Sequence, residues 1–446
     1  MSKHRWLFAW GLGSIAAGAA SLLVPLYVVQ LGGDPFELGL LGAVAAFVGT
    51  PGALVWGRLA DRTSNPRAVI LFSLVGVGVL LGAVPLFSSI LVLILLNALL
   101  WLVFAAAGPV LTLLVVADVP ESAWNQEIAL LNKYQGYGWA AGLLLGIAWS
   151  AAVGQFLSVT ATQQSLFVAC GVAAVVAAVL LARWMPAPTE RQLGRVDAQR
   201  VARLLSTGRR GVRSATFAFS PNRLYWSTRN VHPRKLADRF TPTLATYFLA
   251  VVLFFTGFAA FFAPLPLFLS DVGGFSSDMV FGLYLLSSLG SAVFYTGAGR
   301  LSSRIDLRVL QTSALGTRAL AMPLVAVVGA TIAGSLLGTL ATGVLFLLVG
   351  ISWAVIAVTA GTIVTRIAPT ALRGEALGVY TALSTLAGGI GSIAGGALAT
   401  RFDFVTAFGA AGVVIFVGAA LVLALRSISA RTKIIHDRPP QALGED

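Results

Sequence analysis

Twelve apolar runs, each close to the length of a membrane-spanning helix, constrain this chain more than any other feature of its sequence. A helix needs about 20 mostly apolar residues to cross roughly 30 Å of bilayer hydrocarbon. Only helices and closed barrels satisfy their backbone in lipid, and these runs lack the period of two of barrel strands. The sequence therefore predicts an all-α, polytopic membrane protein. Its expected spans are residues 7–31, 37–57, 68–87, 90–117, 131–153, 165–184, 244–270, 278–298, 309–329, 333–364, 372–398 and 403–426.

Composition supports this class. The 446 residues are 57% hydrophobic and only 11% charged, whereas soluble globular chains carry about 25% charged residues. The first run begins like a secretory signal peptide, but apolar residues continue to Leu31, too far for a short signal core. We therefore expect it to be a retained helix. The single Cys170 lies in an apolar run, where it is expected to be a buried small hydrophobe.

Positive charge predicts the orientation. With the N-terminus inside, the inner segments hold fifteen Lys and Arg residues and the outer segments hold only Arg401, leaving aside the long central loop. Cytoplasmic loops of membrane proteins carry such an excess. We therefore expect a multi-pass protein of the cell membrane with both termini cytoplasmic. The net charge of +13 then marks the inner face, which argues against nucleic acid as a partner.

The chain repeats itself. The segment "GRLADR" at 57–62 returns as "GRLSSR" at 299–304, and "VPLYVVQLGG" at 24–33 resembles "LPLFLSDVGG" at 265–274. Further on, Pro120 pairs with Pro369 and Gly142 with Gly391, at an offset of 249 rather than 241 or 242. Ordered markers with so little drift predict two copies of a six-helix unit. Because six is even, both copies enter the membrane from the same side and form parallel repeats.

These repeats predict four parts. They are an N-terminal six-helix bundle at 1–184, a basic central loop at 185–242, a C-terminal six-helix bundle at 243–430 and a cytoplasmic tail at 431–446. Residues 191–205 fit a basic amphipathic helix lying on anionic lipids of the inner leaflet. A solvated linker between the halves is the alternative. For residues 207–242 the sequence predicts no regular structure.

The turn between the second and third spans carries a family signature. Two parallel six-helix halves, a long central loop and the pattern Gly-x-Leu-x-Asp-Arg resemble the major facilitator superfamily of secondary transporters. Residues 368–396 are similar to the stretch that leads through the eleventh helix of that family. The resemblance covers nearly the whole chain except the central loop and the tail. It implies an architecture in which the two halves rock about a central substrate site.

The resemblance also implies an inner gate. Asp61 would lie against the start of the eleventh helix near 372–375, where the helix dipole favours an anion, and Arg58 or Arg62 would meet Asp118. Charges that merely anchor the turn among lipid headgroups are the alternative. The second copy departs from the pattern because Ser303 replaces the aspartate. The expected gating residues are Gly57, Arg58, Asp61, Arg62, Asp118, Arg300, Arg304, Arg373 and Glu375.

Glycines at four-residue spacing mark close helix packing. They occur at Gly138, Gly142 and Gly146 in the fifth span and at Gly391 and Gly395 in the eleventh. In the family these helices pack between the halves, so the resemblance implies a sliding interface there. Ordinary close packing is the alternative.

The substrate cavity is expected to be aromatic and neutral. The first, fourth, seventh and tenth spans, which line the cavity in the family, hold no acidic residue at mid-depth, which leaves proton coupling in doubt. Arg318 is the one charged residue at mid-depth of a span, and we expect it to be a structural or snorkelling arginine. The expected cavity residues are Tyr27, Gln30, Asn97, Trp101, Gln135, Phe258, Phe262, Trp353 and Thr359.

The predicted function is secondary transport of a small molecule, with export of a lipophilic or amphipathic compound favoured. The alternatives are an uptake carrier or facilitator for a metabolite or sugar, and a non-transporting receptor or scaffold. No enzyme, cofactor or metal site is expected, since no ligand cluster appears and His4, His232 and His436 lie outside the spans. The chain is expected to be a monomer in the lipid bilayer, and whether protons are coupled stays open.

Overall fold

The computed structural model describes residues 5–62, 65–116, 119–120, 124–185, 241–369 and 372–436. The predicted amphipathic helix at 191–205 and the irregular segment at 207–242 fall almost wholly outside these ranges. The described residues form helices and connecting turns, without a strand among them. The all-α prediction is therefore confirmed.

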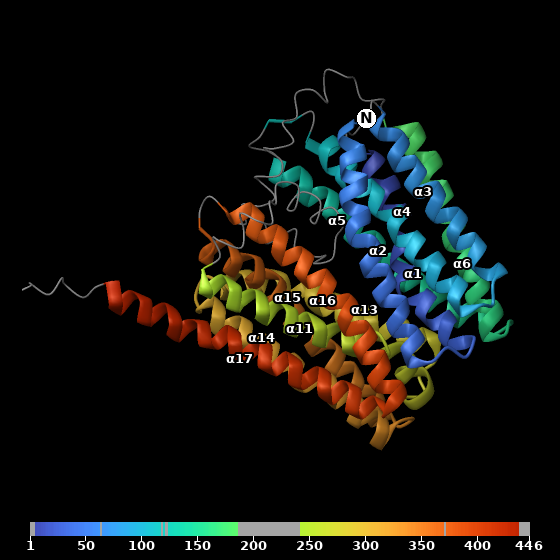
Figure 1. The fold of residues 1–446 in the computed structure, drawn as a ribbon. Coiled ribbons are helices and arrows are strands. Elements are labelled where there is room, and N and C mark those ends of the chain that lie inside the picture. The colour runs from blue at the N-terminus through green and yellow to red at the C-terminus, as the bar shows by residue number, and fades with distance from the viewer. Residues whose placement is uncertain are drawn as a thin grey trace, which may run out of the picture.

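Among the described residues, six long helices form each half (Figure 1). The N-terminal half consists of α1 (Arg5–Gln30), α2 (Pro35–Arg62), α3 (Pro66–Ala83), α4 (Ile90–Val116), α5 (Trp124–Val153) and α6 (Val159–Trp184), with a short 3-10 turn η1 (Val84–Leu86). The C-terminal half consists of α11 (Pro242–Phe262), continued by α12 (Leu265–Leu267) and the π-helix η4 (Phe268–Val272), then α13 (Ser277–Leu301), α14 (Leu307–Ile332), α15 (Leu336–Ile367), α16 (Arg373–Arg401) and α17 (Phe404–His436).

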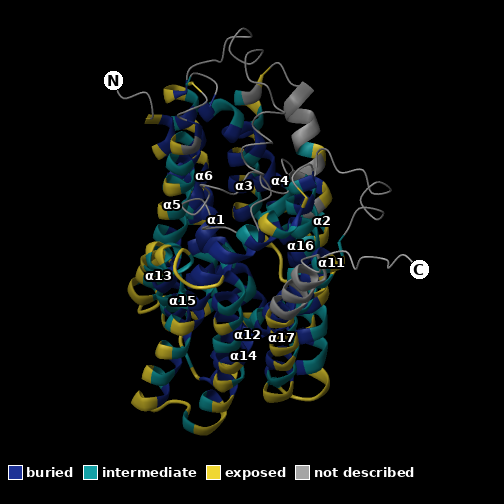
Figure 2. Cartoon of the chain, turned by 90° about the vertical axis from the view of Figure 1, so that its left-hand side faces the viewer, coloured by how far each residue is buried: buried dark blue, intermediate teal, exposed yellow. Residues whose placement is uncertain are grey.

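Within the described ranges, eleven helical segments are long and apolar enough to cross a membrane. The remaining long helix, α2, is apolar over Pro35–Gly49 and completes the twelve. Exposed residues lie all around the bundles (yellow in Figure 2), and large apolar side chains are among them, such as Phe156 at 85% and Val293 at 79% exposure. A surface with so much exposed apolar area suits lipid rather than water. The chain is thus a multi-pass membrane protein.

The largest differences between the predicted spans and these helices are three helix ends and one break within a span. α5 begins at Trp124 and α6 at Val159, each earlier than its apolar run, because polar residues continue a helix beyond the hydrocarbon. The seventh span is not one regular helix, since Pro264 ends α11 and the chain continues as α12 and η4. Finally, α17 extends to His436, beyond the expected start of the tail.

An equivalent N-cap follows each copy of the repeated turn. Asn65 accepts a hydrogen bond from the Ala68 amide at the start of α3, and Asp306 accepts one from the Arg308 amide at the start of α14. These are N-caps, which satisfy backbone donors that have no partner within the helix. Asp306 is therefore the counterpart of Asn65, 241 residues earlier. It does not replace Asp61.

A second pair of equivalent contacts follows each cap. Arg67 donates a hydrogen bond to the Ala182 carbonyl on α6, and Arg308 donates one to the Leu425 carbonyl on α17. The two arginines are also 241 residues apart. Each joins the third helix of its half to the sixth. The repeat read from short motifs thus continues as a repeat of side-chain contacts.

Glycine packing shows the same duplication. A Cβ added at Gly142 on α5 would lie 2.3 Å from the Ile15 carbonyl oxygen on α1. A Cβ added at Gly391 on α16 would lie 2.1 Å from the Thr256 carbonyl oxygen on α11. Both positions accept only glycine without a shift of the helices. The first and fifth helices of each half therefore approach equally closely in both copies.

The two halves meet at one end of the molecule. We call it the far end, because it is the end of the molecule opposite the start of α1. It includes the connection between α1 and α2 and the connection between α16 and α17. There α2 packs along α16, α5 packs against α13, and α12 packs against α1. The ribbons of α2 and α16 lie close at the far end and spread apart toward their other ends (Figure 1). The chain thus has two six-helix bundles that converge at the far end.

Candidate substrate site and gates

Hydrogen bonds between the halves lie at the far end. The Phe36 amide at the start of α2 donates to Thr400 Oγ1 on α16 at 3.0 Å. Gln163 Nε2 on α6 donates to Ser277 Oγ on α13 at 3.4 Å. Both are weak, neutral bonds between groups near helix ends, each contributing about 1 kcal/mol. Such contacts hold two bodies together and still break and re-form readily.

Small residues bring the halves into close contact at the same end. A Cβ added at Gly39 on α2 would lie 2.4 Å from the Ser392 carbonyl oxygen on α16. One added at Gly396 on α16 would lie 2.4 Å from the Pro35 carbonyl oxygen. In lipid, glycines allow helix backbones to approach and gain dispersion energy. Gly39 and Gly396 therefore form the close-packed part of the far-end contact.

The glycines expected at a sliding interface mostly lie elsewhere. Gly138 and Gly142 of α5 face α1, and Gly391 and Gly395 of α16 face α11, all within one half. Gly146 alone of these five faces the other half, against the ring of Phe281 on α13. The four-residue spacing of these glycines predicted close helix packing correctly. The prediction that they lie at a sliding interface between the halves was wrong for four of the five glycines. Spacing cannot show which neighbour a glycine stripe faces.

Only part of the expected inner gate can be placed. Gly57, Arg58, Asp61 and Arg62 lie in the last turns of α2, but their side chains are outside the described part. Asp118 is also outside the described residues. The contacts of Asp61 and Asp118 therefore stay predictions.

The C-terminal partners of that gate are better defined. α16 begins at Arg373 and has Glu375 in its first turn, as expected for an anion-accepting helix start. The Arg373 Nε atom is buried without an acceptor among the described residues. Arg300 and Arg304 are exposed near the end of α13. Ser303 is exposed too, and its hydroxyl donates to the Arg300 carbonyl at 2.7 Å within its own turn.

An aromatic cluster occupies the N-terminal half. Trp101 on α4 donates its indole N–H to Asn97 Oδ1 at 3.1 Å. Its ring lies 6.0 Å from Phe104 and 6.0 Å from Trp139 on α5, and Phe104 stacks on Trp10 of α1 at 5.6 Å. Trp101 and Trp139 are half-buried, while Trp10 is 1% exposed. We call these four rings and Asn97 the N-terminal aromatic cluster.

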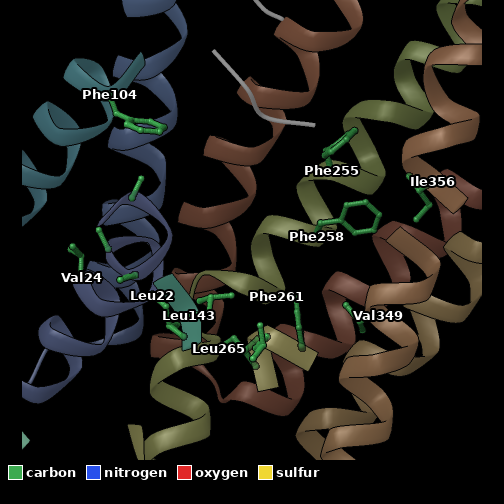
Figure 3. Packing of buried hydrophobic residues seen from close by; sticks show 14 of the residues in the cluster. Leu22, Val24, Phe104, Leu143, Phe255, Phe258, Phe261, Leu265, Val349 and Ile356 are labelled. Atoms are coloured by element: carbon green, nitrogen blue, oxygen red, sulfur yellow. The ribbon is translucent and has the colours of Figure 1, made fainter. Parts of the chain in front are cut away.

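A second aromatic cluster occupies the C-terminal half. Phe255 and Phe258 on α11 contact Trp353 on α15, each with ring centroids 6.3 Å apart, and Phe255 also contacts Tyr380 on α16. Figure 3 shows Phe258 projecting from α11 toward the helix that carries Val349 and Ile356. Phe258 is 4% exposed, whereas Trp353 and Tyr380 are half-buried. We call these four rings the C-terminal aromatic cluster.

Arg318 joins the C-terminal aromatic cluster from α14. Its guanidinium carbon lies 4.4 Å from the ring centre of Phe258 and 5.1 Å from that of Trp353. Nε donates to Ser352 Oγ at 3.2 Å and Nη2 donates to the Val349 carbonyl at 3.0 Å. The side chain is only 3% exposed, so it does not snorkel to a membrane surface. The snorkelling role is therefore excluded and the structural role is retained. In addition, the guanidinium makes cation–π contacts with the rings of Phe258 and Trp353.

The other expected cavity residues are dispersed. Phe262 is half-buried, with its ring centre 5.9 Å from Arg318. Tyr27 is 1% exposed and accepts a hydrogen bond from Gln164 Nε2 on α6. Thr359 is fully buried and donates to the Val355 carbonyl of its own helix. Gln30 is exposed at the end of α1 and Gln135 is half-buried on α5. Phe258, Phe262 and Trp353 are thus brought together around Arg318, whereas Tyr27 lies in the other half of the molecule.

Carboxylates lie at helix ends throughout the described spans. Asp34 and Glu37 form a reciprocal N-terminal cap on α2, with Asp34 Oδ1 accepting from the Glu37 amide at 2.7 Å and Glu37 Oε2 accepting from the Asp34 amide at 2.9 Å. Glu127, Asp278 and Glu375 lie in first turns of their helices. The described residues also contain no group of acidic, His and Cys side chains that could hold a metal ion.

Two duplicated six-helix bundles meet at one end through readily broken contacts, and each contains an aromatic cluster. This architecture defines the chain as a membrane transport protein. The chain belongs to the major facilitator superfamily, whose family model matches residues 6–392. The family points to transport rather than catalysis.

Solved structures share the whole fold. The chain is similar to a crystal structure of the nucleoside transporter NupG, with a TM-score of 0.66, 13% identity and coverage of 96% of this chain and 99% of that one. It is also similar to an inward-facing, unoccupied structure of a bacterial homologue of the human lysosomal transporter Spinster, with a TM-score of 0.65, 15% identity and coverage of 99% and 100%. At these identities the likeness shows the fold alone. No curated protein is similar enough in sequence to count as a relative.

Proposed function

We propose that the chain transports amphipathic small molecules and exports them, with the apolar part of the substrate lying against aromatic side chains from both halves. The observation that carries the proposal is the pair of aromatic clusters. Each has rings that are only half-buried, among them Trp101 and Trp139 in one half and Trp353 and Tyr380 in the other. Half-buried rings offer contact area to a ligand without loss of their own packing.

The polarity of the helices supports an apolar substrate body. Charged residues are absent from α4 and α11, and α15 has only Arg366 in its last turn. A carrier of sugars needs several polar groups to replace the hydration of the hydroxyls. Here the polar groups near the N-terminal aromatic cluster are few, with Asn97 already accepting from Trp101. A mostly apolar ligand with a small polar part fits this lining better.

Export is the proposed direction because an amphipathic molecule in its uncharged form, such as a protonated weak acid, dissolves in the bilayer and enters a cell without help. A protein that binds such a compound changes its distribution by moving it outward. Nucleosides are the strongest alternative substrates, since the structurally similar NupG is a nucleoside transporter and a flat base stacks on aromatic rings. Uptake would then be the expected direction.

The remaining expectations on topology are part of the same proposal. An even number of spans puts both termini on one side of the bilayer, and the excess of Lys and Arg assigns that side to the cytoplasm. The far end would then face outward. We propose that the central loop between α6 and α11 lies on anionic inner-leaflet lipids and that the protein acts as a monomer of the cell membrane.

Flux into and out of reconstituted vesicles tests the proposal. The panel would contain aromatic amphiphiles, nucleosides and sugars, each measured with and without a pH gradient and in protein-free vesicles. We expect the amphiphiles to move faster than in protein-free vesicles and the sugars to move no faster. Faster nucleoside flux alone would support the alternative substrate class. Equal rates for every compound with and without protein would contradict transport and favour a receptor or scaffold. Dependence on the pH gradient would establish coupling.

A further inference from the structure

Arg318 lies deep in the membrane. It is near the middle of α14 (Leu307–Ile332), about 17 Å along the helix from its start at 1.5 Å per residue. Its neighbours Phe258 and Trp353 are also near the middle of their spans, Pro242–Val272 and Leu336–Ile367. A lipid headgroup at the surface of a roughly 30 Å hydrocarbon layer does not reach this depth. Any anion that meets Arg318 must therefore come as a solute.

No carboxylate neutralises this arginine within the described part of the chain, where every acidic side chain lies at or beyond a helix end. Its recorded partners are a hydroxyl, a carbonyl and three aromatic rings. Tyr295 of α13 interacts with it electrostatically, but a phenol is neutral at physiological pH. The positive charge is thus held by dipoles and ring faces alone.

The guanidinium also keeps hydrogen-bonding capacity. Arginine has five N–H donors in a planar fork, and the recorded bonds use one on Nε and one on Nη2. Three donors, two on Nη1 and one on Nη2, are not used by these two bonds. A planar edge with free donors matches a carboxylate or phosphate oxygen pair, which arginine binds in two parallel bonds.

Keeping an uncompensated charge here is expensive. Removing an ion from water costs several kcal/mol even after relaxation, and ionisable residues inside membranes usually mark a substrate or ion path. Joining α14 to α15 does not require a charge, because a glutamine could donate to the Ser352 hydroxyl and the Val349 carbonyl. A purely structural role therefore does not explain why the residue is an arginine.

We propose that Arg318 binds the anionic group of the substrate, a carboxylate, while Phe258 and Trp353 contact its apolar body. The inference rests on the proposed function and narrows its substrate class to amphipathic anions. Trp353 and Phe262 are half-buried, whereas Arg318 and Phe258 are almost fully buried. The substrate would therefore approach Arg318 past Trp353 and Phe262. The aromatic rings then serve two purposes: they stabilise the unoccupied cation and bind the ligand's ring or chain.

Equilibrium binding to the full-length protein in nanodiscs tests the inference. The probes are naphthylacetate, naphthylacetamide and naphthylethylammonium, which share one aromatic body and differ in charge. We expect wild type to bind the carboxylate at least about tenfold more tightly than the amide, as hydrogen bonds to a charged group predict. In Arg318→Gln this preference should vanish while amide binding persists. Arg318→Lys, which keeps the charge without the fork, should restore part of it.

Arg308→Gln is the matched control, because it also removes a guanidinium-to-carbonyl bond from α14, to Leu425. It should leave the preference for the carboxylate unchanged, and thermal unfolding of each variant checks that it is folded. Nanodiscs of purely zwitterionic and of partly anionic lipid distinguish the source of the anion. Equal preference in both supports a solute, and loss of the preference in anionic lipid would show that a lipid headgroup occupies the site.

The two proposals fail differently. If wild type binds carboxylate and amide equally, the anion site is wrong and the amphipathic substrate class stands. If wild type binds neither, the proposed substrate class itself is wrong, and the anion site is wrong with it. An unchanged carboxylate preference in folded Arg318→Gln would also overturn the anion site, since the charge would then come from elsewhere.

Discussion

The backbone amide of Phe36 donates a hydrogen bond to Thr400 Oγ1 at 3.0 Å, joining the first turn of α2 to the last turn of α16. These residues belong to different halves and lie 364 positions apart in the chain. Together with Gly39 and Gly396 beside them, they close the molecule at the far end. An alternating-access transporter must separate these contacts in every cycle, and the predictions below address them and the two aromatic clusters.

Gly39→Leu should open the far end. Its side chain would meet the Ser392 carbonyl, so α2 and α16 would have to separate. We expect a cysteine introduced by Gln163→Cys, which is 3% exposed in wild type, to react several-fold faster with a membrane-impermeant thiol reagent. The native Cys170 is fully buried and contributes little background.

Gly49→Leu is the control for that change. Gly49 is also on α2, but a Cβ there has nothing within 4 Å among the described residues. It should leave the labelling rate of Gln163→Cys unchanged. Equal rates for Gly39→Leu and Gly49→Leu would show that the glycine contact does not hold the far end closed.

Gly142→Ala and Gly391→Ala should destabilise the protein by similar amounts. Each added methyl group would meet a backbone carbonyl on the neighbouring helix, Ile15 in one half and Thr256 in the other. Overpacking of this kind costs about 1–3 kcal/mol. Thermal unfolding in detergent would measure both, with Gly409→Ala as control because a Cβ there meets nothing within 4 Å. A large cost at one glycine and none at the other would contradict the structural repeat.

Asp61→Asn should slow transport, whereas Ser303→Ala should change it little. The resemblance places Asp61 at the inner gate, where loss of its charge would weaken the interaction with the start of α16 by about 0.3–1 kcal/mol. Ser303 is exposed and bonds only within its own turn. Initial rates in vesicles would separate the two. Wild-type rates for Asp61→Asn would refute the gating role of this residue.

Trp353→Ala should weaken ligand binding by roughly five- to thirtyfold, because one aromatic contact contributes about 1–2 kcal/mol. Trp149→Ala provides the comparison. Trp149 on α5 is half-buried like Trp353, but its indole bonds Ser165 on α6 and it lies outside both aromatic clusters. Titration with naphthylacetate would measure the difference. Equal losses in the two variants would place the ligand away from the C-terminal aromatic cluster.

The fold was largely predictable because a lipid-facing helix leaves a strong signal. About 20 apolar residues in a row admit few structures, and the twelve runs correspond to the twelve long helices. The repeat could also be recognised in the sequence. The segments 57–62 and 299–304 carry the same two arginines at the same place, where one apolar span ends and the next begins. The break at Pro264 was the main local miss, and the closely spaced Pro264 and Pro266 were its available signal.

The site was less predictable. Periodicity shows that Gly142 and Gly391 pack closely, but a helix has neighbours on several sides and only the assembled bundle shows which one each glycine meets. Arg318 illustrates the same limit. Its partners Phe258, Ser352 and Val349 come from two other helices, and nothing in the sequence near Arg318 names them. A charge within an apolar span was the one available signal.

The most direct test of alternating access is to lock the far end and measure flux. A Cβ added at Gly42 would lie 3.3 Å from the Ser392 Cβ, close to the spacing of a disulfide, so Gly42→Cys with Ser392→Cys should cross-link α2 to α16. The single variants serve as controls for the oxidant. Our account predicts that oxidation of the double variant stops transport of the substrate and that reduction restores it. Full transport by the cross-linked protein would contradict it.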